Sequence, residues 1–421
     1  MEDTTFLPYG RQHITNEDID AVVDVLKSDW LTQGPYVPDF EEALARTLGT
    51  REAVACASGT AALHLSMLAL GIRTGDAVVT SPITFVATAN CARFVGARVI
   101  FADVDAETGL IDPESVARIL EKDSGRTIKA ILPVHFAGQP ADLAQIHELA
   151  LRHGAWVVDD ACHALGAAYD KSGQTFRMGG NPHSDLTVFS FHPVKHIATG
   201  EGGAVATDNE ELADRLRLFR NHGITRSGFI NTDMAYSPDG IPNPWYYEMD
   251  TLGFNYRLTD IQAALGLSQL TKLPWSLQRR QEIAQTYDRL IREAFAEDDV
   301  TPLIARPNVS HAYHLFVVKI DFNRLGVSRA VVMNRLRARG IGTQVHYIPV
   351  HLQPYYRRVS PTDPWSLPGA EAYYAKALSL PMYPDLTNED IERVVGELAK
   401  ALGTTPKKTS QARAVGHDHT A

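Results

Sequence analysis

Apolar runs and amphipathic stretches alternate along the chain from about residue 50 to residue 210. Short runs rich in valine and isoleucine are typical of strands, whereas apolar residues spaced three and four apart are typical of helices. The predicted strands are EAVACAS (52–58), DAVVTS (76–81), ARVIFADV (97–104), IKAILPVHF (128–136), AWVVDDA (155–161), DLTVFSF (185–191) and GGAVATD (202–208). Helical spacing separates most of them, for example over 59–70, 112–122 and 141–154. Together they predict an α/β fold whose mainly parallel sheet is covered by helices on both faces.

The rhythm changes on either side of this region. TNEDIDAVVDVLKS (15–28) predicts a helix that Thr15 and Asp18 open as a capping box. Beyond about residue 270 the pattern predicts a smaller α+β domain, with strands at 311–320 and 341–350 and helices at 328–340 and 388–402. The predicted organisation is an N-terminal arm and helix (1–29), a large domain (30–270), a small C-terminal domain (271–402) and a disordered polar tail (403–421).

Charge and cysteine content restrict the class of protein. The 421 residues carry a formal net charge of −10, from 40 basic and 50 acidic residues. This balance argues against nucleic acid or an anionic membrane as the main partner. No apolar stretch approaches the roughly eighteen residues of a membrane span. Cys56, Cys91 and Cys162 lack the spacing of a disulfide framework, so we expect a cytoplasmic protein in a reducing compartment.

Two strand ends carry candidate polar sites. In ACASGTAAL a strand ends at Ser58 and a helix begins at residues 59–60, so the free N–H groups suit either an anion or an ordinary N-cap. In AWVVDDACHALGA, Asp159 and Asp160 end an apolar strand, and strand alternation lets one of them face a site above the sheet. His163 follows, but no third ligand for a metal is evident nearby. No metal site is therefore predicted.

Two further stretches follow the same logic. FSFHPVKHIATGEGGAV places Lys195 in a loop after the carboxyl end of a strand, where open α/β sheets bind ligands. Ser190 precedes it, and the glycines at 200–203 let the backbone turn or approach a ligand closely. A lone lysine is otherwise a solvated surface charge. In NYRLTDIQAALGLSQL, Asn255 and Arg257 precede a helix start, free either to reach a ligand or simply to lead into the cap.

These parts together suit one cofactor. A phosphate needs a helix N-terminus and hydroxyl groups, and a pyridine nitrogen that must stay protonated needs a buried carboxylate. An aldehyde needs an amine with which to form an imine. Those are the requirements of pyridoxal 5′-phosphate (PLP), which is the cofactor that the sequence predicts.

Seven motifs in order resemble the DegT/DnrJ/StrS family of PLP-dependent sugar aminotransferases: SDWLTQGP, SGTAALH, PITFVATAN, DDACHALGA, SFHPVKHIATGEGGAV, NYRLTDIQAALGLSQL and QVHYIPVHLQPYY. The resemblance covers about residues 6–402 and implies the type I aminotransferase fold. Within the family, YGRQHIT…LKSDWLTQGP and FHPVKHIATGEGG most resemble the branch of pseudaminic acid synthesis. That branch implies transfer of an amino group, expected from L-glutamate, to C4 of a UDP-linked 4-keto-6-deoxy-N-acetylhexosamine.

The resemblance also implies a role for each matching residue. Lys195 is the catalytic lysine that binds the cofactor and moves the proton, and Asp160, not Asp159, is the partner of the pyridine nitrogen. The other cofactor contacts are Gly59, Thr60, Phe85, His163, Ser190 and Asn255. Asn255 reaches the phosphate of the neighbouring subunit, which implies a homodimer with shared active sites. The nucleotide-sugar contacts are Tyr9, Asp29, Trp30, Leu31, Thr32, Gln344, Val345, His346, Tyr347 and His351.

Other functions stay open. The same fold and cofactor would serve a C3 aminotransferase or one that acts on a dTDP-sugar. Family members with a dehydratase role lack the lysine at this position, so Lys195 disfavours that branch. A non-enzymatic PLP-binding regulator would need a basic helix or arm to bind DNA, and the one basic cluster is the short PKK near the C-terminus.

Overall fold

The seven predicted strands form one sheet in the computed structural model of the chain, which describes residues 5–359 and 366–404. They are β1 (Glu52–Cys56), β2 (Ala77–Thr80), β3 (Arg98–Phe101), β4 (Ile128–Leu132), β5 (Trp156–Asp160), β8 (Leu186–Ser190) and β9 (Gly203–Thr207). Their order is β1-β9-β8-β5-β4-β2-β3. Within this sheet β9 runs antiparallel to β1 and β8, its two neighbours, and the other strand pairs are parallel, so the prediction of a mainly parallel sheet is confirmed.

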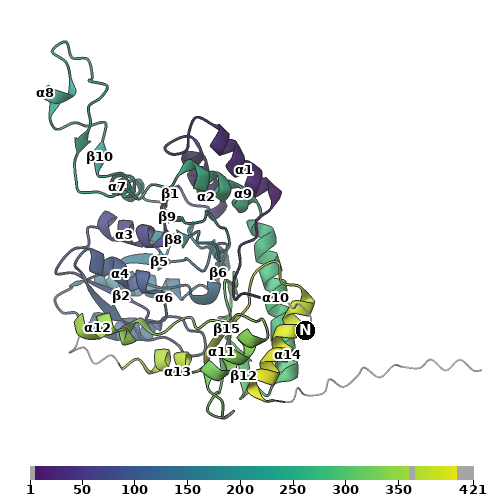
Figure 1. Cartoon of the computed structure of the whole chain (residues 1–421). Coiled ribbons are helices and arrows are strands. Elements are labelled where there is room, and N and C mark those ends of the chain that lie inside the picture. Colours follow the sequence, from purple (N-terminus) through teal and green to yellow (C-terminus); the bar gives the residue numbers. More distant parts are fainter. Residues whose placement is uncertain (1–4, 360–365, 405–421) are drawn as a thin grey trace, which may run out of the picture.

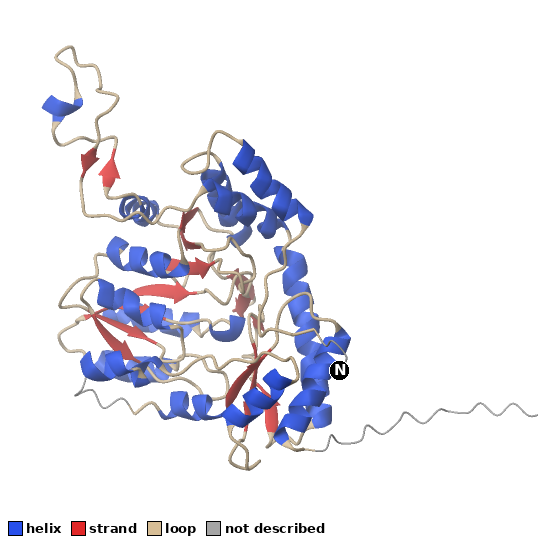
Figure 2. Ribbon diagram, in the orientation of Figure 1, coloured by secondary structure: helices blue, strands red, loops and turns tan. Residues whose placement is uncertain are grey.

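Helices cover both faces of this sheet, and the strands β1, β8 and β9 divide their side chains between two cores. Val54 of β1 packs into a core with α3 (Gly59–Ala69), α4 (Val86–Phe94), α5 (Pro113–Lys122), α6 (Leu143–His153) and α7 (Glu210–Arg220). Its neighbours Ala53 and Ala55 pack into a second core with α2 (Tyr36–Leu48) and α9 (Asp260–Thr271). Figure 2 shows the strands in red, enclosed by the blue helices.

A second, smaller sheet follows in the chain. Its antiparallel strands are β12 (Val300–Pro302), β14 (Phe316–Ile320) and β15 (Ala377–Leu380), in the order β12-β14-β15. A separate core joins it to α10 (Leu273–Ala294), α11 (Arg329–Ala338) and α14 (Asn388–Leu402). Figure 1 shows these helices gathered beside β12 and β15. Residues 405–421 of the predicted disordered tail lie outside the described residues.

The strand predicted over 341–350 is wrong. Two isolated bridges, Leu7 with Ile341 and Gln344 with Ser379, are the strand-like pairings that the described residues show for this segment. Its backbone bonds are divided between two partners, because Gly342 N–H donates to the N-terminal arm and Gln344 N–H donates to β15. The apolar run therefore reflects burial between two segments, and β15 supplies the third strand of the small sheet.

Among the parts of the fold that expose large apolar side chains are α1 and a projecting arm. α1 (Asn16–Lys27) has the predicted capping box, but it buries Asp18 and Val25 and leaves Ile19 and Leu26 exposed. The arm formed by β10 (Ile224–Thr225), α8 (Thr232–Ala235) and β11 (Glu248–Met249) stands away from the body of the molecule (Figure 1). No pattern in the sequence predicted this arm.

Short elements complete the described chain: β6 (Ala168–Lys171), β7 (Gln174–Arg177), β13 (Val309–Ser310), α12 (Pro354–Val359), α13 (Pro368–Lys376) and the 3₁₀ turns Phe136–Gly138 and Val350–Leu352. β13, β6 and β7 form a small antiparallel sheet. Across residues 5–359 and 366–404, no helix is long and apolar enough to cross a membrane.

Candidate active site

Three parallel strands of the large sheet end at one edge, and each end carries one of the polar stretches that the sequence singled out. β5 ends at Asp160, β8 ends at Ser190, and β1 is followed by Ser58, the N-cap of α3. Lys195 lies in the loop that joins β8 to β9. The carboxyl edge of parallel strands is where open α/β sheets bind ligands. The fold thus delivers the four residues to the predicted edge.

Asp160 is buried on the side of the sheet that faces Lys195. Its Oδ2 accepts a hydrogen bond from Thr88 Oγ1 at 2.6 Å, and its Oδ1 accepts from Cys162 N–H at 3.2 Å. Burial lowers the pKa of Lys195, and the negative charge of Asp160 opposes that effect by raising it. The carboxylate is therefore oriented by two donors and is electrostatically coupled to the lysine.

Asp159 is buried on the other side of the same strand. Its Oδ2 lies 3.4 Å from Thr187 Oγ1 and 3.6 Å from His135 Nε2, in a region that is closed to solvent. Strand alternation places neighbouring side chains on opposite faces. The surroundings of the two carboxylates agree with the prediction that one of them faces the site.

Lys195 is half-buried and has no carboxylate partner among the described residues. Its Nζ lies 3.5 Å from His314 Nε2. Burial lowers the pKa of Lys195 and holds the pKa of His314 well below its usual range. The histidine is consequently neutral near pH 7. An amine with a lowered pKa is a better nucleophile and base at neutral pH.

The start of α3 combines an N-cap with free amides. Ser58 Oγ accepts from Ala61 N–H at 3.1 Å, as an N-cap does. The N–H groups of Gly59 and Thr60 have no partner among the described residues, so both the cap and an anion site fit this geometry. Glycine is required at 59 by a close approach, since a Cβ there would lie 2.9 Å from Ser190 Cβ.

A series of aromatic rings extends from the lysine. His163 packs against His314 with ring centroids 4.2 Å apart, and its Nε2 lies 3.1 Å from Tyr347 OH. The Tyr347 ring in turn lies 6.4 Å from that of Phe85. Phe85 precedes α4 and is 58% exposed, so its ring is available to a ligand. Of the two predicted ring contacts, His163 thus lies next to the histidine that contacts Lys195, and Phe85 is connected to it through Tyr347.

The N-terminal arm continues this series of rings. Tyr9 lies 5.3 Å from His346 between ring centroids, and His346 lies 4.9 Å from Tyr347. His346 Nδ1 is fixed at 2.8 Å from Ser379 Oγ, and the exposed Gln344 pairs with the same strand through its backbone. The structure therefore brings together Tyr9 and residues 344–347, as predicted for the substrate side.

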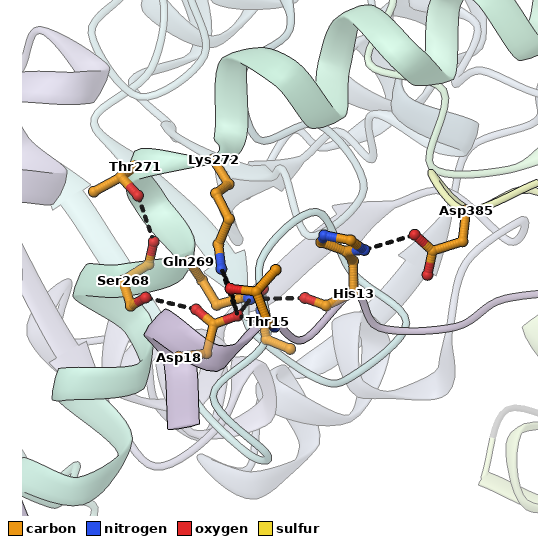
Figure 3. Close-up of polar contacts among 9 residues, drawn as sticks. His13, Thr15, Asp18, Ser268, Gln269, Thr271, Lys272 and Asp385 are labelled. Atoms are coloured by element: carbon orange, nitrogen blue, oxygen red, sulfur yellow. Dashed lines mark hydrogen bonds and ion pairs between the residues drawn. The ribbon is translucent and has the colours of Figure 1, made fainter. Parts of the chain in front are cut away.

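Figure 3 shows how the arm is held in place. The fully buried carboxylate of Asp18 accepts hydrogen bonds from Ser268, Gln269 and Lys272 at the end of α9. Gln269 Nε2 also donates to the carbonyl of His13 at 2.8 Å. On its other side, Gln269 Oε1 accepts from Ala198 N–H at 3.3 Å in the loop that carries Lys195. One side chain thus links the arm to the lysine loop.

Two predicted contacts lie outside this cluster. Residues 29–32 form an exposed loop between α1 and α2, at the start of α9 rather than beside Lys195. Asn255 is exposed and pairs with Asn221 where the projecting arm joins the body. Within the described chain, therefore, no hydrogen bond joins either segment to Lys195.

His351 is a third predicted contact that lies apart. It is buried, with its ring centroid 6.3 Å from that of Phe101 and its Nε2 3.7 Å from Glu371 Oε1. These contacts belong to the packing beneath α13. His351 thus supports the segment that carries Tyr347 and does not line the cluster around Lys195.

Two residues of the cluster were missed by sequence reasoning. Thr88 lies in PITFVATAN, where Phe85 alone was singled out, yet it donates the short hydrogen bond to Asp160. His314 lies in HAYHLFVVKI, which was considered only as a strand. The available signal was the same in both cases, a polar side chain within a mostly apolar run.

The residues present fit PLP. Lys195 offers an amine without an acid partner, Asp160 offers a buried carboxylate, and α3 offers two free amides. His163 Nδ1 is buried and has no partner among the described residues, so it is available to a polar group of a ligand. In the described ranges no group of three or more metal-ligating side chains occurs.

Comparisons with protein families, curated proteins and solved structures agree with one another. The profile described as the DegT/DnrJ/EryC1/StrS aminotransferase family matches residues 12–399. The spore coat polysaccharide biosynthesis protein SpsC of Bacillus subtilis is 40% identical over 391 residues, which cover 93% of this chain and 95% of SpsC. Helicobacter pylori PseC, described as an aminotransferase involved in the biosynthesis of pseudoaminic acid, is 32% identical with a TM-score of 0.81, over 95% of this chain and 100% of PseC.

A further structure bears on the cofactor. The putative sugar aminotransferase Spr1654 from Streptococcus pneumoniae, in its PLP-form, is 27% identical with a TM-score of 0.82, over 94% of this chain and 99% of that one. The resemblance, the fold class and the PLP cofactor predicted from the sequence are confirmed by these matches.

Proposed function

Because the chain belongs to the DegT/DnrJ/EryC1/StrS aminotransferase family, we propose that it moves an amino group from L-glutamate to C4 of a UDP-linked 4-keto-6-deoxy-N-acetylhexosamine. The likeness to PseC supports this sugar class. The observation that carries the proposal is Lys195, a half-buried amine with no carboxylate partner among the described residues, on the same sheet edge as the buried Asp160.

Lys195 is the proposed catalytic residue. When bound, PLP carries the amino group between the two substrates and takes up the electron pair of a carbon that loses its proton. Burial lowers the pKa of Lys195, so its Nζ accepts and returns a proton more readily near neutral pH. The neutral His314, 3.5 Å away, orients this amine without adding a positive charge beside it.

Asp160 is the proposed partner of the pyridine nitrogen. A buried carboxylate stabilises a nearby cation, and Thr88 and Cys162 hold this one in a single orientation. His163 is assigned to the ring hydroxyl because its Nδ1 is unpaired within the described chain while its Nε2 is engaged by Tyr347. Phe85 is assigned to stacking on the cofactor ring, because it occupies the position of the family's stacking residue.

The remaining contacts are assigned by what each segment offers. The amides of Gly59 and Thr60 and the hydroxyl of Ser190 suit a phosphate. Tyr9, residues 344–347 and the exposed loop 29–32 are assigned to the nucleotide sugar. His351 has a supporting role in this assignment, because its ring packs against Phe101.

We also propose that two copies of the chain share their active sites. Apolar side chains are exposed on α1 and on the projecting arm, including Ile19, Leu26, Ile230, Trp245 and Leu252. Patches of this kind favour a protein partner. Asn255 lies at the base of the arm, outside the lysine cluster of its own subunit. A second copy would cover these side chains and would allow Asn255 to contact the partner's phosphate.

The expectation of a cytoplasmic protein is part of the proposal. Cys56, Cys91 and Cys162 are free thiols. Free and mostly buried thiols suit a reducing compartment.

Product identification tests the proposed function. The holoenzyme is incubated with L-glutamate and a panel of 4-keto and 3-keto sugars linked to UDP or dTDP, and the products are identified by NMR. We expect an amino group at C4 of the UDP-linked sugar. A product formed only from a 3-keto or a dTDP-linked sugar would establish the second candidate, which shares the fold and the cofactor. If no sugar gives a product, the non-enzymatic PLP-binding regulator is the candidate function that remains.

A further inference from the structure

One buried carboxylate holds the loop between α1 and α2. Asp260 is fully buried, and its Oδ2 accepts from Gly34 N–H at 2.8 Å while its Oδ1 accepts from Tyr36 N–H at 2.9 Å. Its own N–H donates to the carbonyl of Leu31 at 3.1 Å. Three hydrogen bonds therefore join this loop to the first residue of α9.

Asp260 is not required to cap its own helix. Thr259 and Gln262 already form a complete capping box at the start of α9. The helix α2, in contrast, has no side-chain cap of its own, because its N-cap is Pro35. A buried carboxylate is costly unless donors satisfy it, and the donors of Asp260 are amides of the loop and of α2. Its side chain thus serves the neighbouring segment.

The loop combines a fixed backbone with exposed apolar side chains. A Cβ on Gly34 would lie 2.5 Å from Trp30 Cβ and 3.2 Å from Asp260 Oδ1, so the loop packs too closely there for any side chain. Trp30 and Leu31 are nevertheless 55% and 48% exposed. Side chains presented to solvent from a held backbone are suited to contacting a ligand.

The start of α9 also contacts the lysine loop. Gln262 Nε2 donates to the carbonyl of Glu201 at 2.7 Å, within the glycine-rich turn that follows Lys195. The same turn of helix therefore holds the loop before α2 through Asp260 and the lysine loop through Gln262. These hydrogen bonds to the start of α9 oppose a displacement of the loop before α2 relative to the lysine loop.

We propose that Asp260 is a positioning residue for the nucleotide sugar, which it serves by holding residues 29–32 in register with the lysine loop. This inference rests on the proposed function, in which residues 29–32 contact the nucleotide sugar. Asp260 touches neither substrate nor cofactor. Its loss should therefore affect the reaction with the sugar and spare the reaction with L-glutamate.

Asp260→Asn tests the proposal with a change of equal size. The amide NH₂ would face one of the two loop N–H groups, so that one hydrogen bond is lost and a buried donor is left unpaired. We expect the KM for the UDP-linked keto sugar to rise about tenfold or more, with kcat changed less. The spectral change of the holoenzyme with L-glutamate alone should keep its rate. Hydrogen–deuterium exchange at Gly34 and Tyr36 should become faster.

Asp123→Asn is the matched control. Asp123 also accepts from two backbone amides, those of Thr127 at 3.1 Å and Ile128 at 2.8 Å, but it lies at the amino end of β4, on the opposite edge of the sheet. The same substitution there should lower stability without changing the KM for the sugar. Gly34→Ala is a second variant that displaces the loop and leaves Asp260 intact. It decides the question if Asp260→Asn does not fold, and it should raise the same KM.

The outcomes separate this inference from the proposed function. Wild-type protein that aminates no nucleotide-linked sugar overturns the proposed function, and the inference with it. Active wild type combined with an unchanged KM in Asp260→Asn, or in Gly34→Ala if the first variant is not folded, overturns the inference alone. An equal rise of KM in Asp123→Asn also overturns it, because the effect would then be one of stability.

Discussion

The two adjacent carboxylates at the end of β5 show how differently two faces of one sheet can treat the same residue type. Asp160 faces an amine, Lys195, and an aromatic series that ends in the exposed ring of Phe85. Asp159 faces a closed region, where it lies near Thr187 and His135. Both carboxylates are buried, so burial by itself does not mark a functional residue.

Unpaired polar atoms do not separate the two faces either. His163 Nδ1 lacks a partner within the described chain on the lysine side, and Asp159 Oδ1 lacks one on the other. What differs is the presence of an amine without an acid partner and of a ring open to solvent. A candidate site is recognised here by complementary groups that meet at a surface.

Of the substitutions on the lysine-facing side of the sheet, removal of Lys195 should reduce activity most. Lys195→Ala should lower turnover about 10³-fold or more, because the residue that moves the proton is lost while the phosphate contacts survive. The assay is kcat with L-glutamate and the keto sugar. Borohydride reduction of wild-type holoenzyme should attach a pyridoxyl group to Lys195. A label on another lysine, or a comparable loss of activity in the exposed-site control Lys171→Ala, would show that the wrong lysine was assigned.

Exchange of each carboxylate for its amide compares the two faces directly. Asp160→Asn should reduce kcat roughly 100-fold or more with the fold intact, because an amide does not keep a ring nitrogen protonated as a carboxylate does. Asp159→Asn should instead lower the free energy of unfolding by about 1–3 kcal/mol, the cost of an imperfectly paired buried group. Steady-state kinetics and urea unfolding measure the two effects. A damaging Asp159→Asn beside a mild Asp160→Asn would reverse the assignment.

Mixing two inactive proteins tests whether a second subunit completes the lysine face. Asn255→Asp would place a negative charge beside the partner's phosphate and weaken cofactor binding, and Lys195→Ala abolishes the chemistry. In a mixed dimer both lesions fall on one composite site and the other site is intact. Activity should return to about a quarter of wild type if exchange is random and the sites are independent. Absence of recovery after confirmed subunit exchange would mean that Asn255 serves its own chain.

The smallest expected effect is a loss of stability in mild acid, caused by buried histidines both beside the lysine cluster and outside it. Burial lowers the pKa of both His311 and His346 from 6.5 to about 3. The unfolded chain therefore binds protons first, so their contribution to stability is complete above about pH 6.5 and is lost progressively as the pH falls toward 3. Between pH 7.5 and 5.5 each histidine should cost about 1.4 kcal/mol.

Urea unfolding at the two pH values measures this loss. His346→Gln, which changes the aromatic series beside Tyr9, and His311→Gln, outside that series, should each reduce the pH dependence by a similar amount. Only the first should also alter the KM for the sugar. An unfolding midpoint that does not change between pH 7.5 and 5.5 would contradict the assignment of buried neutral histidines.

The sequence predicted those parts of the fold that depend on local periodicity. All seven strands of the large sheet, the capping box of α1 and the helix over 388–402 were identified because burial imposes a period of two or 3.6 residues on the chain itself. The strand over 341–350 failed, because its apolar residues are buried between the arm and β15 without forming a ladder. Periodicity reports burial and not the pairing partner.

The residues of the candidate site likewise fall into those that the sequence predicted and those that only the tertiary structure revealed. The sequence by itself determined that Lys195, Asp160, Ser190 and Ser58 stand at strand ends on one sheet edge, since strand direction follows from the alternation of strands and helices. Only the tertiary structure decided that His314 lies against Lys195, that His351 packs against Phe101, and that Asp260 holds a loop more than two hundred residues away in the chain. Such contacts depend on how distant segments pack, and no local pattern of hydrophobic and polar residues encodes which distant segments will meet.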